Sequence, residues 1–155
     1  MDPESTKELL ADVFSQVAER LAFMFSEPAE EDEFPDFCQQ ALMATMTFEG
    51  PTTGRLTLAV PHDMCPELTA NVLGLDPDDD AITESASQDA LKELLNITCG
   101  HVLTTLAGEE PIFNLSVPEI APLPNDGWNK LYREAGTCPL LVDDNPVLIH
   151  LQLDS

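Results

Sequence analysis

The feature that most constrains the fold is a long amphipathic segment that runs from about Ser85 to Ala107. Residues at helical spacing share one face of this segment: Leu91, Leu94, Leu95, Thr98, Val102 and Leu106. Ser85 and Gln88 form a capping box at the start, and Gly108 stands where a helix end is expected. We therefore expect a helix whose apolar face turns towards the core.

Strands are expected in pairs on either side of this helix. Residues 41–50 and 54–61 alternate in polarity around the loop "EGPTTG", which predicts a hairpin. "TCPLLV" and "VLIHLQLD", joined by "DDNP", predict a second hairpin, and "PIFNLSVPEI" predicts a further strand. Paired strands favour a mostly antiparallel sheet with helices packed against it. We predict an α/β protein of the α+β type, with residues 1–155 as a single domain.

The remaining segments divide into helices and loops. Ser5 and Glu8 form a capping box, and apolar spacing extends from there, so a helix is expected from Ser5 to near Ser26. "HDMCPELTANVLG" predicts a shorter helix that ends at Gly74. Proline and acidic residues favour loops in "EPAEEDEFPD" and "PLPNDGWNKLYREAG".

The charge balance narrows the classes of partner. The chain has 6 Lys and Arg against 29 Asp and Glu, a formal net charge of -23. Binding to nucleic acid or to an anionic membrane needs clustered cations, so we expect neither. Such a charge is typical of a salt-adapted or acid-biased proteome, and a basic partner is the alternative explanation.

The N-terminus and the cysteines indicate the compartment. "MDPESTKELL" lacks the basic and apolar pattern of a signal peptide, and no apolar run approaches the ~20 residues of a membrane span. We therefore expect a cytoplasmic protein. Its cysteines, at positions 38, 65, 99 and 138, are then expected to be free buried thiols.

Common catalytic and metal-binding motifs are missing from the sequence. No cysteine is followed by the arginine of a cysteine-based phosphatase, and GxSxG, HExxH and Walker patterns are absent. "DPDDDAITESAS" has Ala81 and Ser87 where a calcium loop needs glycine and glutamate. His62, Cys65, Cys99 and His101 suggest zinc by composition alone. We expect no metal site of the chain's own.

The outer face of the long helix is unusual for a surface helix. Asp89, Glu93, Asn96 and Gly100 form one stripe, here called the outer stripe, almost opposite the core face. Asp89 and Glu93 repel each other at i,i+4, and Gly100 in mid-helix costs about 1 kcal/mol against alanine. The stripe is either a docking ridge for a partner or a solvated acidic face with Gly100 packed under a loop.

The long helix resembles the signature helix of the CheC/CheX/FliY family of chemotaxis phosphatases. The family pattern reads here as Asp89, Glu93, Asn96 and Pro118, with the proline inside "NLSVPEI" and a glycine in "ELLNITCGHV". In the expected first helix, alanine stands where a second Glu-x-x-Asn copy would need asparagine: Ala11 after Glu8, and Ala22 after Glu19. A single copy makes the resemblance one to the CheX-like branch.

The resemblance implies hydrolysis of the aspartyl phosphate on a CheY-type response regulator. Asn96 would orient the attacking water, Glu93 would pair with the regulator's active-site lysine, and Asp89 and Gly100 would be supporting contacts. The Mg²⁺ ion and the phosphoaspartate would belong to the regulator, so the chain would need no cofactor of its own. An acyl phosphate is already activated, which fits the missing nucleophile.

The resemblance also implies an antiparallel sheet covered by helices, and a homodimer formed by strand pairing. "VLIHLQLD" or a neighbouring strand is a candidate for the pairing edge. The alternative function is a non-catalytic module that docks a response regulator or a flagellar component. A purely structural acidic protein would bind no regulator at all.

Overall fold

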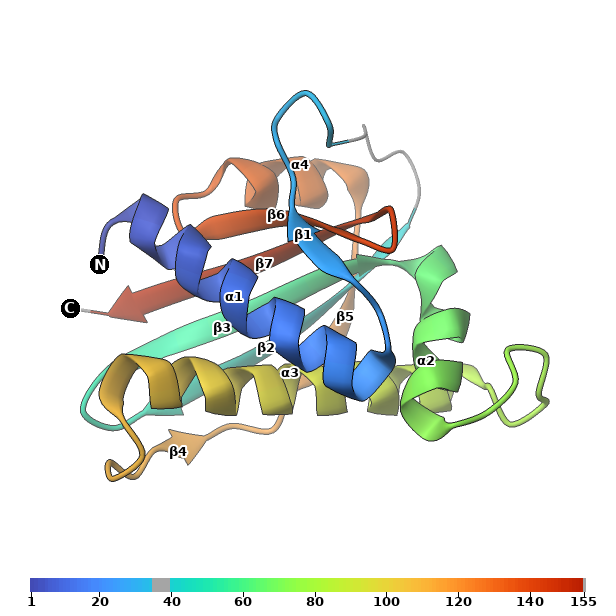
Figure 1. Cartoon of the computed structure of the whole chain (residues 1–155), viewed down its shortest axis with the longest axis horizontal. Helices are drawn as coiled ribbons and strands as arrows, with labels where there is room; N and C mark the ends of the chain where they lie inside the picture. Colours follow the sequence, from blue (N-terminus) through green and yellow to red (C-terminus); the bar gives the residue numbers. More distant parts are fainter. Residues whose placement is uncertain (35–39, 155) are drawn as a thin grey trace.

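An antiparallel sheet occupies the centre of the computed structural model, which describes residues 1–34 and 40–154. Its strands follow the order β1-β6-β7-β3-β2-β4, and β5 also pairs with β2 (Figure 1). The strands are β1 Ser26–Pro28, β2 Ala41–Glu49, β3 Thr53–Pro61, β4 Asn114–Leu115, β5 Glu119–Leu123, β6 Thr137–Val142 and β7 Asn145–Asp154. All the pairings are antiparallel, which confirms the predicted sheet and both predicted hairpins.

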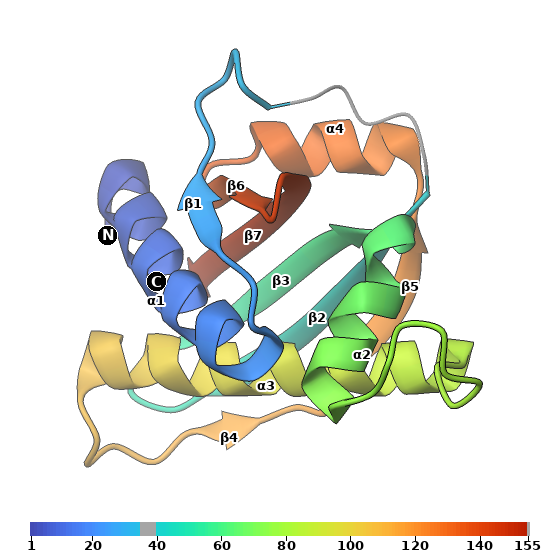
Figure 2. The same cartoon turned by 45° about the vertical axis from the view of Figure 1, so that its right-hand side comes forward.

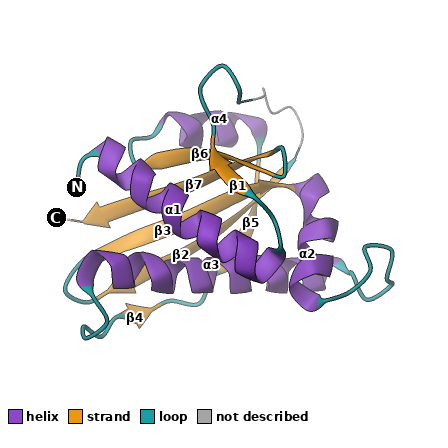
Figure 3. Ribbon diagram, in the orientation of Figure 1, coloured by secondary structure: helices purple, strands orange, loops and turns teal. Residues whose placement is uncertain are grey.

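Helices cover the two faces of the sheet unequally (Figures 2 and 3). One face packs against three helices, and the other face packs against α4 at one end. The helices are α1 Pro3–Ala22, α2 Cys65–Leu73, α3 Glu84–Ala107 and α4 Asn125–Arg133, with a short 3-10 turn at His62–Met64 before α2. The predicted α+β class is therefore confirmed. None of the helices in the described residues is both long and apolar enough to cross a membrane.

Alternation along the strands explains the two faces. In β2, Leu42 and Met46 face α1, α2 and α3, while Ala41 turns to the α4 side. In β7, Ile149 lies in the large core and Leu148 packs near Trp128 of α4. Successive side chains of a strand point to opposite faces, so each strand contributes to both layers.

The start and the end of α1 differ from the sequence prediction. The helix begins at Pro3, and Asp2 is its N-cap: the Asp2 Oδ1 accepts a hydrogen bond of 2.8 Å from the Ser5 amide. The capping box predicted at Ser5 is wrong, because Ser5 already lies inside the helix. The helix ends at Ala22, before the predicted end near Ser26, because Phe23 adopts a left-handed backbone with φ of 53°.

The start of α3 also differs, whereas its end is confirmed. Thr83 is the N-cap, and its side chain accepts a hydrogen bond of 3.1 Å from the Ala86 amide. The capping box predicted at Ser85 is therefore wrong by about half a turn. At the other end, Gly108 follows the helix with φ of 87°, and its amide donates to the Thr104 carbonyl oxygen.

Two predicted loops contain regular structure. β1, Ser26–Pro28, overlaps the start of the acidic connector and pairs with β6. The rest of that prediction falls partly on positions 35 and 36, and the thiol prediction for Cys38 falls there too, outside the described residues. The segment after β5 forms α4, whose Trp128 and Leu131 are buried. A Cβ at Gly127 would lie 2.8 Å from the Leu123 side chain, so glycine allows α4 to pack closely.

The expected strand "PIFNLSVPEI" is interrupted into β4 and β5, which both pair with β2. Ser116 bridges the interruption: its amide donates to the Thr47 carbonyl oxygen, and its hydroxyl accepts from the Thr47 amide. The buried Pro118 follows, and it has no N–H to donate to the ladder. The signature proline therefore stands where the edge strand breaks.

One predicted pairing edge is excluded by the topology. β7 pairs with β3 on one side and with β6 on the other, so "VLIHLQLD" lies inside the sheet. The edges within the described residues are β1 at one side and β4 with β5 at the other.

Candidate functional site

The helix α3 presents the outer stripe to solvent. Asp89, Glu93 and Asn96 are exposed, and Gly100 is half-buried. The opposite face buries Leu91, Leu94, Leu95, Thr98 and Val102, as the spacing predicts, and the predicted Leu106 packs partly buried against the core. The structure therefore brings the four predicted site residues together along about three turns of one helix.

The side chains of Glu93 and Asn96 have no partner among the described residues. Neither side chain makes a hydrogen bond or an ion pair there. Thr98, by contrast, donates its hydroxyl proton to the Leu94 carbonyl oxygen at 2.7 Å. An exposed carboxylate and an exposed amide one turn apart offer acceptors and a donor pair to a visiting molecule.

Gly100 is not required by the fold of the chain itself. Apart from the helix's own backbone, a Cβ at this position would meet no described residue within 4 Å, and the backbone there is helical. The interpretation that Gly100 packs under a loop is therefore wrong. Glycine at this position makes the helix about 1 kcal/mol less stable than alanine would, and no side-chain contact within the described residues offsets that loss.

The space beside Gly100 is a small hollow of about 170 Å³. One wall is α3, and the other is the segment that turns back along it through β4 (Figure 1). Phe113 and Leu115 line this second wall, and Leu115 is 45% exposed. The hollow lies next to the outer stripe, and Thr104 and Glu109 add polar groups to its lining.

The cysteines of the described residues lie within the core. Cys65, Cys99 and Cys138 are free and buried, which confirms the prediction for these positions. Loss of hydration on burial raises the pKa of each thiol to about 11. They remain protonated at neutral pH and are poor nucleophiles. Within residues 1–34 and 40–154, no three His, Cys, Asp or Glu side chains are grouped as metal ligands.

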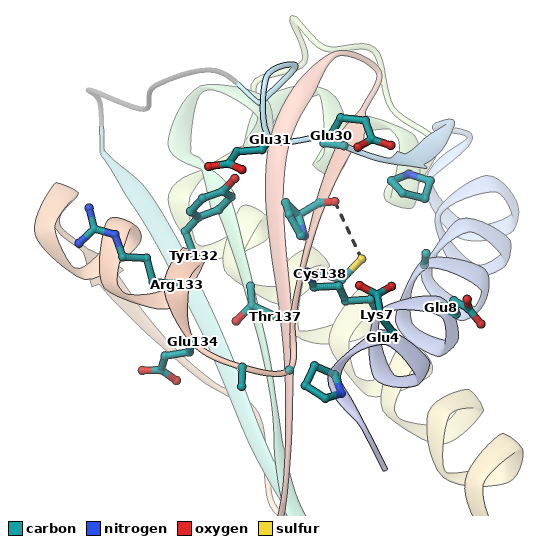
Figure 4. A pocket seen from close by; sticks show the side chains of 17 residues that line it. Glu4, Lys7, Glu8, Glu30, Glu31, Tyr132, Arg133, Glu134, Thr137 and Cys138 are labelled. Atoms are coloured by element: carbon teal, nitrogen blue, oxygen red, sulfur yellow. Dashed lines mark hydrogen bonds between the residues drawn. The ribbon is translucent and has the colours of Figure 1, made fainter.

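A larger hollow of about 600 Å³ lies elsewhere, between the N-terminal half of α1 and the start of β6 (Figure 4). Glutamates surround it, together with Lys7, Tyr132 and Arg133. The Cys138 thiol on its wall donates to the Pro139 carbonyl oxygen at 3.9 Å. None of the predicted site residues lines this hollow.

Comparison with known families shows to which family the chain belongs. A family model described as chemotaxis phosphatase CheX matches residues 42–123, more than half of the 155-residue chain. The chain belongs to the CheX family. The matched region contains all of α3 and Pro118, so it includes every residue of the signature. The resemblance seen in the sequence is thereby confirmed.

Solved structures of CheX proteins share the fold. The CheX protein of Vibrio vulnificus superposes with a TM-score of 0.68 at 14% identity, over 99% of both chains. A CheX–CheY–BeF3–Mg complex from Borrelia burgdorferi gives 0.65 at 14% identity, over 96% of this chain and 97% of the other. A CheC-like superfamily protein from a Shewanella species gives 0.67 at 17% identity, over 97% of both. No curated protein matches the sequence.

Sequence reasoning missed the surroundings of the outer stripe. It did not predict the hollow at Gly100, or a second groove on the other side of α3 that Arg20 and His101 line. Both depend on contacts between segments distant in sequence. The scarcity of cations in the chain was the one signal that could have drawn attention to Arg20 and His101.

Proposed function

We propose that this chain hydrolyses the aspartyl phosphate of a CheY-type response regulator. The observation that carries the proposal is the exposed, unoccupied Glu93–Asn96 pair on a helix that matches the CheX family. The CheX protein from Borrelia forms a complex with CheY, BeF3 and magnesium, which supports a CheY-type partner here.

Asn96 orients the attacking water in this proposal. Its short amide enters the regulator's active site and holds the water in line with the bond from phosphorus to the aspartate oxygen. The water oxygen bonds to phosphorus, the bond to the aspartate breaks, and inorganic phosphate and a free carboxylate result. Asparagine suits the task because it stays neutral and has both donors and an acceptor.

The other residues of the outer stripe fix the angle of approach. Glu93 pairs with a lysine of the regulator, and its free carboxylate is exposed for that purpose. Asp89 supports the same contact one turn earlier, and Gly100 lets the regulator approach the helix closely. The Mg²⁺ ion belongs to the regulator, where it spreads the charge of the phosphoryl group.

The chain is also proposed to form a homodimer through an edge strand. Since β7 is internal, the pairing edge is either β1 or the β4–β5 side. Analytical ultracentrifugation measures this directly, and a monomer at all concentrations would reject it.

The proposed function is tested by phosphate release from a magnesium-loaded, phosphorylated CheY-type regulator of the same organism. Wild type should accelerate release, Asn96→Ala should abolish the acceleration, and Glu93→Ala should reduce it. Asn96→Ala should still bind the regulator, because docking depends on the rest of the surface. Binding by wild type without acceleration would instead identify a non-catalytic docking module, and the absence of binding would reject both functions.

A further inference from the structure

A groove between α1 and α3 borders the outer stripe on the side away from the Gly100 hollow. It has a volume of about 170 Å³ and is lined by Gln16, Val17, Arg20, Leu21, Ile97 and His101. Val17 is buried, and Leu21 and Ile97 are half-buried, so the floor is apolar. Arg20 and His101 are exposed and stand at the rim.

The groove and the outer stripe belong to one continuous surface. Ile97 follows Asn96 in the chain, and His101 follows Gly100, so both are one helical step from the stripe. A stable protein interface buries about 800 Å² on each partner, far more than one inserted side chain can supply. A regulator that admits Asn96 therefore contacts surface beyond the outer stripe, and the groove is the adjacent surface on the α1 side.

The charge at the groove contrasts with the rest of the chain. The chain has only 6 Lys and Arg and 3 His, against 29 acidic residues. Two of these few basic residues, Arg20 and His101, line this groove, and none of its lining residues is acidic. In the larger hollow, by contrast, glutamates surround Lys7 and Arg133. Neither the Arg20 nor the His101 side chain makes a hydrogen bond or an ion pair with another described residue. The Arg20 guanidinium is thus free to meet a carboxylate on a partner.

We propose that this groove is a specificity-determining contact with the phosphorylated response regulator. The Arg20 guanidinium pairs with a carboxylate beside the regulator's active site, and an apolar side chain of the regulator packs over Leu21 and Ile97. This inference rests on the proposed function and adds α1 to the docking surface. Its role is selection of the regulator, because a net charge of -23 repels acidic proteins everywhere except where a cation is displayed.

The test compares charge reversal at two exposed arginines. Arg20→Glu removes the proposed contact, and Arg55→Glu makes the same change in net charge on β3, on the opposite face of the sheet. For phosphate release from the phosphorylated regulator, Arg20→Glu should raise KM about tenfold with kcat within about twofold. Arg55→Glu should leave both close to wild type. Equal effects of the two variants would overturn the proposal.

An uncharged variant tests the groove itself. Gln16→Trp places a large side chain at the exposed edge of the groove and should raise KM without a loss of thermal stability. An unchanged KM would count against occupation of the groove. Asn96→Ala, measured alongside, separates the two claims. If it remains active, the proposed function fails; if it is inactive while Arg20→Glu matches Arg55→Glu, only the groove contact fails.

Discussion

The two long helices α1 and α3 pack on the same face of the sheet, where the C-terminal part of α1 meets α3 at an angle (Figure 2), yet their outer surfaces differ. The ends of α1 follow the rules of helix stability: Asp2 caps it, Pro3 opens it, and Arg20 stands in its last turn. Both helices have like-charge i,i+4 pairs on their exposed sides, Glu4–Glu8 and Glu8–Asp12 in α1 and Asp89–Glu93 in α3. Of the two helices, α3 alone has a glycine in its middle, at Gly100 of the outer stripe.

The same comparison bears on the second Glu-x-x-Asn copy that the sequence of α1 lacks. A second Glu-x-x-Asn copy would need asparagine at position 11 or 22, and the structure places alanines there in the core. Ala11 is 9% exposed and Ala22 is fully buried. These positions of α1 face inward, whereas Asn96 of α3 faces solvent. After Glu8 or Glu19, a second copy would therefore turn its asparagine into the core.

The largest predicted effect separates two neighbouring residues of α3. Leu95→Ala leaves a cavity at a fully buried position and should lower the free energy of unfolding by about 3 kcal/mol. Asn96→Ala should change it by less than about 0.5 kcal/mol, because the side chain is exposed. Its turnover should nevertheless fall about a hundredfold or more. Urea denaturation measures the free energy of unfolding, and phosphate release measures turnover. A strongly destabilised Asn96→Ala would contradict the division of α3 into a core face and an outer stripe.

A smaller effect is expected from placing the missing asparagine on α1. Ala22→Asn completes a second motif with Glu19 but buries an amide, so it should lower the free energy of unfolding by about 2 kcal/mol. Turnover should not increase. Asp12→Asn, at an exposed position of the same helix, is the control and should be close to neutral. A gain in phosphatase rate by Ala22→Asn would show that burial of position 22 does not prevent α1 from acting as a second site.

The smallest effect concerns the cap of α1. Hydrogen bonds from the Ser5 amide and hydroxyl hold the pKa of Asp2 below its ordinary value. The charged cap therefore contributes stability at neutral pH, and that contribution is lost as the pH falls through the lowered pKa. Thermal melts from pH 7 to pH 2 should show a slightly steeper loss for wild type than for Asp2→Asn. Identical profiles would mean that the charge of the cap is unimportant.

Sequence periodicity predicted what depends on local pattern. The core face of α3, the outer stripe and both hairpins follow directly from the spacing of apolar residues. The helix α4 was not predicted, because the turn-forming residues of its segment favoured a loop although Trp128 and Leu131 are apolar. β1 has 3 residues and exists only by pairing with β6, and the groove at Arg20 exists only because α1 lies against α3. Such tertiary contacts leave no periodic signal.

Gly100 provides the most direct test of the claim that the outer stripe is shaped for a partner. We predict that Gly100→Ala raises the free energy of unfolding by about 1 kcal/mol, since no described residue outside the helix backbone lies within 4 Å of the added Cβ. The same variant should bind the phosphorylated regulator more weakly, and Gly100→Leu should block docking while the fold stays intact. Both variants should be measured by urea denaturation and by regulator binding. If both variants bind the regulator and hydrolyse its phosphate as wild type does, and Gly100→Ala is also more stable, the outer stripe is not shaped for a partner.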